Sequence, residues 1–200
     1  LNKGSVTNTN ADDCAGGFVG WSYGSNLIIR NCYNTGNITF LDAKPTVGWA
    51  HVAGLIACGF KAKEDVLKVS GCYNKGNITA CGEDISTFIA FIRDFNDGEC
   101  VIENCYSEGN LDCVFPCSSM YIGGFVSSIY NSVTFKNCRF SGTTKGYVSN
   151  TCASFVGRAC DNVVIDGCES SKNVYAGVRS DVTAGDRPMV SGFVNAWYPQ

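Results

Sequence analysis

The chain has 200 residues, of which 45% are hydrophobic and 16% charged, and its formal net charge is −3. This composition can bury a continuous core, and no apolar run approaches the ~20 residues that cross a bilayer, so no membrane span is expected. The 15 Lys and Arg residues are scattered and form no basic stripe, which excludes nucleic acid as an expected partner.

One nine-residue stretch recurs along the chain. It reads Asn-Cys-Tyr-Asn-Thr-Gly-Asn-Ile-Thr at residues 31–39 and Gly-Cys-Tyr-Asn-Lys-Gly-Asn-Ile-Thr at residues 71–79, and weaker copies follow at 104–112, 137–143 and 167–175. Its glycine, or the residue in that place, lies at positions 4, 36, 76, 109, 142 and 172, so the copies are 32, 40, 33, 33 and 30 residues apart. A period of this length predicts a solenoid or another repeat array.

Two further blocks complete each repeat. A Gly-Phe-Val-Gly-like block comes first, as at residues 17–20 and 54–57, and a short run rich in β-branched residues leads into the cysteine, as at 27–29 and 66–69. Short apolar alternation bounded by Gly, Asn and Asp is typical of β-strands. We therefore expect three short strands in each repeat. The variable segments between them are expected to be loops on one side, at about residues 40–52, 80–86, 112–121, 145–153 and 176–190.

Strands this short cannot bury an apolar face alone, but coils stacked about 4.8 Å apart align equivalent side chains in ladders. We therefore predict an all-β parallel β-helix, or β-solenoid, of about five coils of 30–40 residues. Both ends of the chain lie inside a repeat, so we expect a segment of a longer protein or assembly that abuts neighbouring repeats or head-to-tail subunits. The expected coils span roughly residues 1–16, 17–52, 53–86, 87–121, 122–153 and 154–191, with a partial coil at 192–200.

Three ladders of equivalent side chains are predicted. One is an inward apolar ladder, and the second is a cysteine ladder whose members act as small apolar side chains. The third consists mainly of asparagines beside a corner, which would hydrogen-bond along the solenoid axis and tolerate a left-handed backbone. In that order the ladders are Phe18, Leu55, Phe88, Phe125, Phe155 and Phe193; Cys32, Cys72, Cys105, Cys138 and Cys168; and Asn37, Asn77, Asn110, Thr143 and Asn173.

The blocks at residues 17–20 and 54–57, with the companion stretch at 31–39, resemble the GLUG repeats of bacterial surface proteins. The resemblance covers nearly the whole chain and weakens after Gly142. It implies a right-handed parallel β-helix in large secreted or wall-attached proteins, including adhesins and the non-catalytic regions of immunoglobulin A-specific metalloproteases. The family motif contains no catalytic residue to carry over. We therefore expect an extracellular or cell-surface structural and binding module that is not an enzyme and has no cofactor.

Aromatic side chains near corners and loops are the candidates for ligand binding. Flat aromatic rows can receive sugar rings or a partner protein, although they can equally cover a sheet. A host or matrix glycan, or a surface protein, is therefore the expected partner. The candidate residues are Trp21, Tyr23, Tyr33, Trp49, Tyr73 and Tyr106.

Two asparagines, Asn37 and Asn77, fit the sequon for N-glycosylation. Because Gly-Asn-Ile-Thr is also the structural repeat, the match has a second explanation that needs no glycan.

The chain has 13 cysteines, an odd number that leaves at least one without a partner inside it. The spacing of Cys113 and Cys117, with Cys81 near the equivalent place one repeat earlier, leaves open a zinc site, a disulfide or plain thiols, and we predict no metal. The cysteines outside the ladder register are the better disulfide candidates, in a connectivity that the sequence does not give. They are Cys14, Cys58, Cys81, Cys113, Cys117, Cys152 and Cys160.

His51 is the only histidine, so no Ser-His-Asp triad or Cys-His dyad is assigned, and we expect His51 to be a loop residue. The competing hypotheses are a fibre-forming structural protein and a polysaccharide-acting β-helix enzyme of lyase or hydrolase type. Such an enzyme would use clustered carboxylates, calcium and a basic residue. The acidic candidates lie at residues 12–13, 83–84 and 94–99, and we expect all three groups to be solvated turns.

Overall fold

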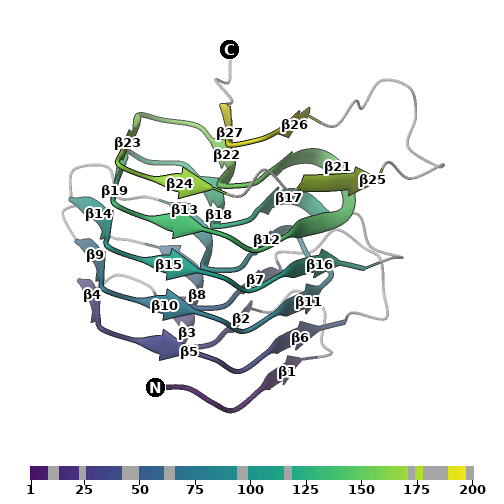
Figure 1. Cartoon of the computed structure of the whole chain (residues 1–200), viewed down its shortest axis with the longest axis horizontal. Helices are drawn as coiled ribbons and strands as arrows, with labels where there is room; N and C mark the ends of the chain where they lie inside the picture. Colours follow the sequence, from purple (N-terminus) through teal and green to yellow (C-terminus); the bar gives the residue numbers. More distant parts are fainter. Residues whose placement is uncertain are drawn as a thin grey trace.

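The computed structural model describes residues 1–8, 14–22, 26–41, 50–60, 66–93, 99–114, 119–170, 174–177 and 189–196. All regular elements within these ranges are β-strands, and their pairs are parallel. The strands stack into a solenoid (Figure 1), so the predicted all-β parallel β-helix is confirmed. Its predicted right hand stays a prediction. Within the described ranges, no helix is long and apolar enough to cross a membrane.

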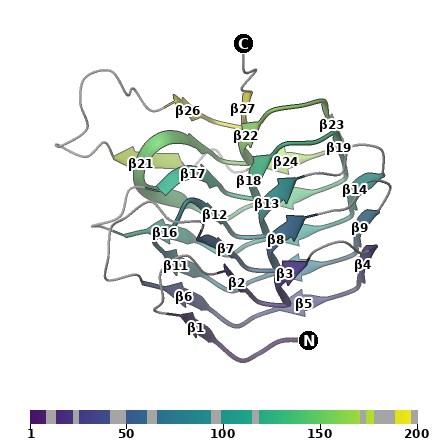
Figure 2. The same ribbon diagram turned by 180° about the vertical axis from the view of Figure 1, so that it is seen from behind.

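Each coil passes through five strips of parallel strands, which we number in the order in which the chain visits them. Strip 1 contains β2 (Cys14–Gly16), β7 (His51–Ala53), β12 (Asp84–Ser86), β17 (Ser119–Gly123) and β26 (Met189–Ser191). Strip 2 contains β3 (Val19–Ser22), β8 (Ile56–Phe60), β13 (Ile89–Arg93), β18 (Val126–Ile129), β22 (Val156–Ala159) and β27 (Val194–Ala196). Figure 2 shows these two strips from behind.

Strip 3 contains β4 (Leu27–Arg30), β9 (Leu67–Ser70), β14 (Cys100–Glu103), β19 (Val133–Lys136) and β23 (Val163–Asp166). Strip 4 contains β5 (Tyr33–Asn34), β10 (Tyr73–Asn74), β15 (Tyr106–Ser107), β20 (Arg139–Phe140) and β24 (Glu169–Ser170). Strip 5 contains β1 (Val6–Asn8), β6 (Ile38–Phe40), β11 (Ile78–Ala80), β16 (Leu111–Cys113) and β25 (Val174–Gly177). The long strand β21 (Thr144–Ala153) continues strip 5 with its first half and strip 1 with its second.

Each coil therefore has five short strands rather than the three that the sequence predicts. The cysteine-containing run divides into strips 3 and 4, because the backbone turns sharply at the residue before each ladder cysteine. Strip 1 was expected to be loops, and this expectation is wrong. Its strands run from a variable residue through an apolar one to a small one, as in His51-Val52-Ala53 and Asp84-Ile85-Ser86. The variable first residue hides this repeat in the sequence.

Two apolar cores run along the solenoid axis. Strips 2, 3 and 4 enclose the first, which includes Phe125 and Phe135, and strips 5 and 1 enclose the second, which includes Ile78 and Ile85. On the strands, core side chains such as Leu67 and Val69 of β9 take alternate positions, as expected where only one face of a strand is turned inward. Burying each of them stabilises the fold by about 1.5–3 kcal/mol.

The predicted inward ladder forms part of the first core. Leu55, Phe88, Phe125 and Phe155 are fully buried. The phenylalanine rings stack with centroid separations of 4.5 Å between Phe88 and Phe125 and 4.9 Å between Phe125 and Phe155. The ladder is less covered at its outermost members, since Phe18 is exposed and Phe193 is half-buried.

A buried polar ladder crosses the interior from strip 4 to the bend between strips 1 and 2. The amide of Asn34 donates to Asn74 Oδ1 at 2.8 Å, and the amide of Asn74 donates to Ser107 Oγ at 3.3 Å. Ser107 in turn donates to Thr87 Oγ1 at 2.7 Å. At the bend, a Cβ on Gly54 would lie 2.2 Å from the Thr87 carbonyl oxygen, so a side chain is excluded there. Where the backbone segments approach most closely, hydrogen-bonded polar side chains therefore fill the interior in place of apolar ones.

The corner between strips 3 and 4 needs a left-handed residue in every coil. Asn31, Asn104 and Asn137 have φ angles of 51°, 51° and 50°, and Gly71 and Gly167 have 60° and 59°. Gly and Asn are the residues that adopt this conformation most readily. The left-handed positions are therefore the residues before the ladder cysteines, and Asn37, Asn77 and Asn110 are not among them.

The predicted hydrogen bonds of the asparagine ladder along the solenoid axis are confirmed. The N–H of Asn77 donates to Asn37 Oδ1, the N–H of Asn110 donates to Asn77 Oδ1, and the N–H of Thr143 donates to Asn110 Oδ1, each at 2.9 Å. These bonds run along the solenoid axis from coil to coil. Asn173 lies outside the described residues.

The five ladder cysteines stack in register, with Cys72, Cys105 and Cys138 buried and Cys32 and Cys168 half-buried. They do more than the small apolar side chains that the sequence predicts. Each thiol donates to the carbonyl two residues earlier, at 3.3 Å for Cys72 and 3.1 Å for Cys105. The Cys105 sulfur also accepts the N–H of Cys72 at 3.5 Å. The thiols therefore satisfy backbone groups at a corner where strand pairing is interrupted.

Eleven described cysteines are reduced thiols, among them the five of the ladder. Of the predicted disulfide candidates, Cys14, Cys58, Cys113, Cys152 and Cys160 belong to this reduced set, so the prediction is wrong for them. Cys81 is disulfide-bonded and does not titrate. Cys117 lies outside the described residues.

Candidate functional site

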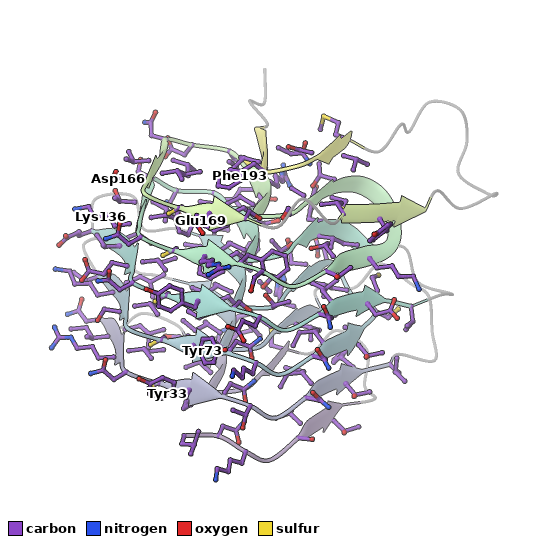
Figure 3. All side chains as sticks on the ribbon, viewed as in Figure 1. Tyr33, Tyr73, Lys136, Asp166, Glu169 and Phe193 are labelled. Atoms are coloured by element: carbon purple, nitrogen blue, oxygen red, sulfur yellow. The ribbon has the colours of Figure 1, made fainter. Side chains whose placement is uncertain are left out.

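Strip 4 presents a row of side chains that point away from the cores. Tyr33, Tyr73 and Tyr106 are register partners on adjacent coils, and Arg139 and Glu169 continue the row. The next residue in each strand points inward, since neighbouring strand residues alternate between the two faces. The common outward register of the three tyrosines is therefore confirmed, and Figure 3 shows Tyr33, Tyr73 and Glu169 along this strip.

The aromatic part of this row is open to solvent. Tyr33 and Tyr106 are 45% and 44% exposed, and Tyr73 between them is half-buried. The rings of Tyr33 and Tyr73 meet edge to face with centroids 6.4 Å apart. Burial, and then the hydrogen bond with Glu108, raises the pKa of Tyr73, so its hydroxyl keeps its proton near neutral pH. The row thus offers ring surfaces together with phenol donors.

Charged side chains border the tyrosines. Lys75 Nζ lies 5.3 Å from the Tyr73 ring centroid and 3.8 Å from Glu108 Oε2. Further along the row, Arg139 Nε lies 3.6 Å from Glu169 Oε2, and both side chains are more than half exposed. The row therefore changes from aromatic to ionic along the solenoid axis.

Strip 3, which neighbours strip 4 in each coil, carries two depressions. One has a volume of about 160 Å³ and is lined by Arg30, Lys68, Glu99, Glu103 and Lys136, among others. Lys68 Nζ and Glu99 Oε2 form an ion pair of 2.6 Å across it. The second, of about 310 Å³, shares Glu99 and Lys136 with the first. Strip 3 therefore offers charges of both signs beside the tyrosine row (Figure 3, Lys136 and Asp166).

The remaining aromatic candidates do not join this row. Trp21 is 53% exposed, but it lies on β3 in strip 2, on the side of the solenoid that Figure 2 shows. Tyr23 and Trp49 lie outside the described residues.

The two sequon asparagines, Asn37 and Asn77, are exposed beside strip 5. Their Oδ1 atoms accept the axial backbone hydrogen bonds described above. Both side chains therefore have a structural role that accounts for the repeat, and their glycosylation stays a prediction.

His51 is not a loop residue. It lies on β7, is fully buried, and has Asp84 of β12 as its register partner on the next coil. His51 Nδ1 lies 3.1 Å from Asp84 Oδ2. Burial disfavours the imidazolium, but the interaction with Asp84, helped by the charges of Cys14 and Glu83, raises the pKa of His51 above its ordinary value.

Other side chains enclose this pair. The His51 ring stacks on Phe91 with centroids 4.5 Å apart and planes 19° apart. Asp84 Oδ1 accepts hydrogen bonds from the hydroxyls of Ser127, at 3.1 Å, and Ser128. Close by, the guanidinium of Arg158 lies over the Tyr130 ring. The prediction that the acidic pair at residues 83–84 is a solvated turn is therefore wrong for Asp84.

The structure thus contains a buried ionisable pair that we did not predict. The missed signal is the alignment of the residues three places before the first residue of each Gly-Phe-Val-Gly-like block, which places Cys14, His51 and Asp84 in one row. Residues 12–13 and 94–98 lie outside the described residues, and Glu99 is exposed and paired with Lys68. Within the part of the chain that the structure describes, no three His, Cys, Asp or Glu side chains group to hold a metal ion.

Comparison with known proteins gives no match: no family model, no curated protein and no solved structure matches the chain. The resemblance to GLUG repeats therefore stays a prediction that rests on the repeat residues themselves.

Proposed function

We propose that this chain is an extracellular, cell-surface structural and binding module of adhesin type that binds a host or matrix glycan on strip 4. The observation that carries the proposal is the row of Tyr33, Tyr73 and Tyr106, two of them nearly half exposed, on adjacent coils of one strip. Aromatic faces favour the apolar faces of sugar rings, and phenol hydroxyls can bond to sugar hydroxyls.

The spacing of the row supports an extended ligand. Adjacent parallel strands lie about 4.8 Å apart, so Tyr33 and Tyr106 are separated by about 10 Å along the axis. A ligand that contacts both must extend across two coils, as a short oligosaccharide chain does. The charged groups that border the row, Lys75 and Glu108, would contact polar substituents of such a chain.

The row is also held rigidly before any ligand arrives. Behind each tyrosine the next residue joins the buried polar ladder, as Asn34 and Asn74 do. A tyrosine has few rotatable bonds, so fixing it on binding costs little conformational entropy. Rigid aromatic contacts on a hydrogen-bonded strip are a suitable platform for recognition.

A glycan array followed by affinity titration of the best ligand tests this function. We expect the double variant Tyr33→Ala/Tyr106→Ala to bind at least about tenfold more weakly, because two aromatic contacts of about 1 kcal/mol each are lost. The matched control is Tyr175→Ala, since Tyr175 is 59% exposed on strip 5 and away from the row. Binding to protein ligands alone, or equal losses in the two variants, would contradict the proposal.

We also propose that further coils stack on the outermost strands, from neighbouring repeats or head-to-tail subunits. Phe18 and Val190 are 36% and 52% exposed, whereas the equivalent Leu55 and Ile122 of inner coils are fully buried. Unpaired strand edges beside exposed apolar groups favour strand addition. Light scattering over a range of concentrations is expected to show association that Val190→Lys weakens. A constant monomer mass would oppose it.

We do not propose the polysaccharide-acting alternative. Its described acidic candidates are separated, because Asp84 lies on strip 1 and Glu99 immediately before strip 3.

A further inference from the structure

The outward row of strip 1 ends in a cysteine beside the buried ion pair. Cys14, His51 and Asp84 are consecutive register partners on three adjacent coils. Parallel neighbours in a sheet lie about 4.8 Å apart, so their side chains adjoin on one face. His51 and Asp84 are fully buried, but Cys14 is only half-buried. Cys14 is therefore the member of this row that a reagent can reach from solvent when no further coil covers β2.

A second thiol adjoins Cys14. Cys58 lies on β8, which contacts β2, and the Cys58 thiol and the Cys14 sulfur are hydrogen-bonded. Both residues are reduced, and Cys58 is fully buried. The hydrogen bond to Cys14, and then burial, raises the pKa of Cys58, so Cys58 keeps its proton near neutral pH. Two thiols in contact, one reachable and one buried, are the parts that disulfide exchange requires.

Besides the two thiols, the site contains a base whose orientation is fixed. Asp84 holds the Nδ1 side of His51, and Ser127 and Ser128 hold Asp84 in turn. Phe91 fixes the plane of the imidazole by stacking on it. His51 Nε2 is buried and has no hydrogen-bond partner among the described residues. A histidine held in this way by a carboxylate can accept a thiol proton and stabilise the thiolate.

We propose that Cys14 and Cys58 form a thiol–disulfide exchange site, in which Cys14 attacks a disulfide substrate and Cys58 resolves the mixed disulfide. His51 serves as the proton acceptor and donor, and Asp84 is its positioning residue. The substrate class is a small-molecule or protein disulfide that can reach Cys14 at the surface. This proposal does not depend on the tyrosine row of strip 4.

The exchange balances in two steps. The Cys14 thiolate attacks one sulfur of the substrate disulfide, the substrate S–S bond breaks, and the first leaving thiolate takes a proton from the His51 imidazolium. Cys58 then attacks the Cys14 sulfur, the bond between Cys14 and the substrate sulfur breaks, and the proton of Cys58 passes to the second leaving thiolate. The substrate is reduced to two thiols, and the two cysteines are oxidised to a Cys14–Cys58 disulfide.

The ladder thiol Cys168 provides a matched comparison inside the same chain. It is half-buried like Cys14, but burial raises its pKa to about 11 and its thiol donates to the Asp166 carbonyl. The register partner next to Cys14 is instead His51, whose imidazolium favours a thiolate at Cys14, and the carboxylate of Asp84 lies one coil further away. Cys14 should therefore be much the more nucleophilic of the two at neutral pH.

The first experiment treats the native, reduced protein with limiting iodoacetamide near neutral pH and maps the labelled peptides by mass spectrometry. We expect Cys14 to react at least about tenfold faster than Cys168, because only a thiolate is an effective nucleophile. Replacement of the base in His51→Gln should lower the rate of alkylation at Cys14 and leave the rate at Cys168 unchanged. Equal rates at the two cysteines in the native protein would overturn the proposal, whatever the stability of the variant.

The second experiment uses oxidised glutathione as the disulfide. We expect the native protein to form a Cys14–Cys58 disulfide, and Cys58→Ser to stop at a glutathione adduct on Cys14. Cys14→Ser should form neither product, whereas Cys168→Ser should behave as the native protein does. Formation of the adduct at Cys168 first, or of a stable Cys14 adduct with no transfer to Cys58 in the native protein, would overturn the assigned roles.

Discussion

Two rows of side chains point away from the apolar cores of this solenoid. One row is exposed to solvent, and the other is buried. On strip 4, Tyr33 and Tyr106 are 45% and 44% exposed, whereas on strip 1 His51 and Asp84 are fully buried. Both rows follow the same alternation along their strands and the same stacking from coil to coil. The direction of a side chain relative to its strand therefore does not decide whether it meets water.

The difference comes from the angle at which neighbouring strips meet. Strip 4 has nothing packed on its outer side among the described residues, but strips 1 and 2 turn their outer sides toward each other. Phe91 of strip 2 covers His51, and Ser128 of strip 2 reaches Asp84. A corner that folds back in this way encloses an ion pair at a position where the strand pattern alone would place it in solvent.

The largest expected effect of a single substitution is at Asp84. Asp84→Ala should lower the free energy of unfolding by about 3–5 kcal/mol, because it leaves a buried histidine without its partner. The comparison variant Glu169→Ala removes a carboxylate of the strip 4 row, whose ion pair with Arg139 is exposed, and should cost at most about 1 kcal/mol. Urea unfolding measures both, and similar losses would show that strip 1 is less enclosed than described.

In β10, the neighbouring residues Asn74 and Tyr73 allow the stability contributions of an inner and an outer position to be compared directly. Asn74→Ala removes hydrogen bonds to Asn34, Gly76 and Ser107, so it should cost about 1–3 kcal/mol. Tyr73→Ala acts on the outer row and should cost less. Thermal and urea unfolding of both variants test this order, and a larger loss in Tyr73→Ala would reverse the assignment of inside and outside.

The buried pair also predicts a dependence of stability on pH. Because the folded state raises the pKa of His51, the stabilisation from its charged form is fully present below the unfolded-state value of about 6.5 and is lost as the pH rises through the folded-state value. The free energy of unfolding should therefore fall over that interval.

Since His51 is the only histidine, its imidazole resonances in an NMR titration report the folded-state pKa directly. In His51→Gln the fall in stability above pH ~6.5 should disappear. A titration midpoint at or below the ordinary histidine value would contradict the prediction.

The smallest expected effect is in the ionic part of the strip 4 row. Arg139→Ala breaks an exposed pair with Glu169, and should change stability by no more than about 1 kcal/mol at low salt. Added salt should shrink the difference further by screening. A loss of stability in Arg139→Ala that persists at high salt would indicate that Arg139 and Glu169 are shielded from solvent, as His51 and Asp84 are.

Much of the fold follows from the repeat residues. The spacing of the cysteine stretch predicts which residues stack along the axis, and the phenylalanine ladder, the axial bonds of Asn37 and Asn77, and the common register of the tyrosines are confirmed. The left-handed corner is not predicted, because Asn31 and Gly71 differ in sequence but share one backbone conformation. Where a position requires a particular backbone conformation, different residues can meet the requirement, so the position is not found by looking for identical residues in the repeats.

The sequence by itself determined the stacking of coils, because a repeat that returns every 30 to 40 residues brings like positions together along the axis. Only the tertiary structure decided how the strips of one coil face each other. The contact of His51 with Phe91, and the approach of Cys58 to Cys14, join residues from different strips, and the stacking register within a strip does not predict which strips face each other. Those contacts depend on the bend between strips 1 and 2, where small residues such as Gly54 let backbones approach within a distance that no side chain allows.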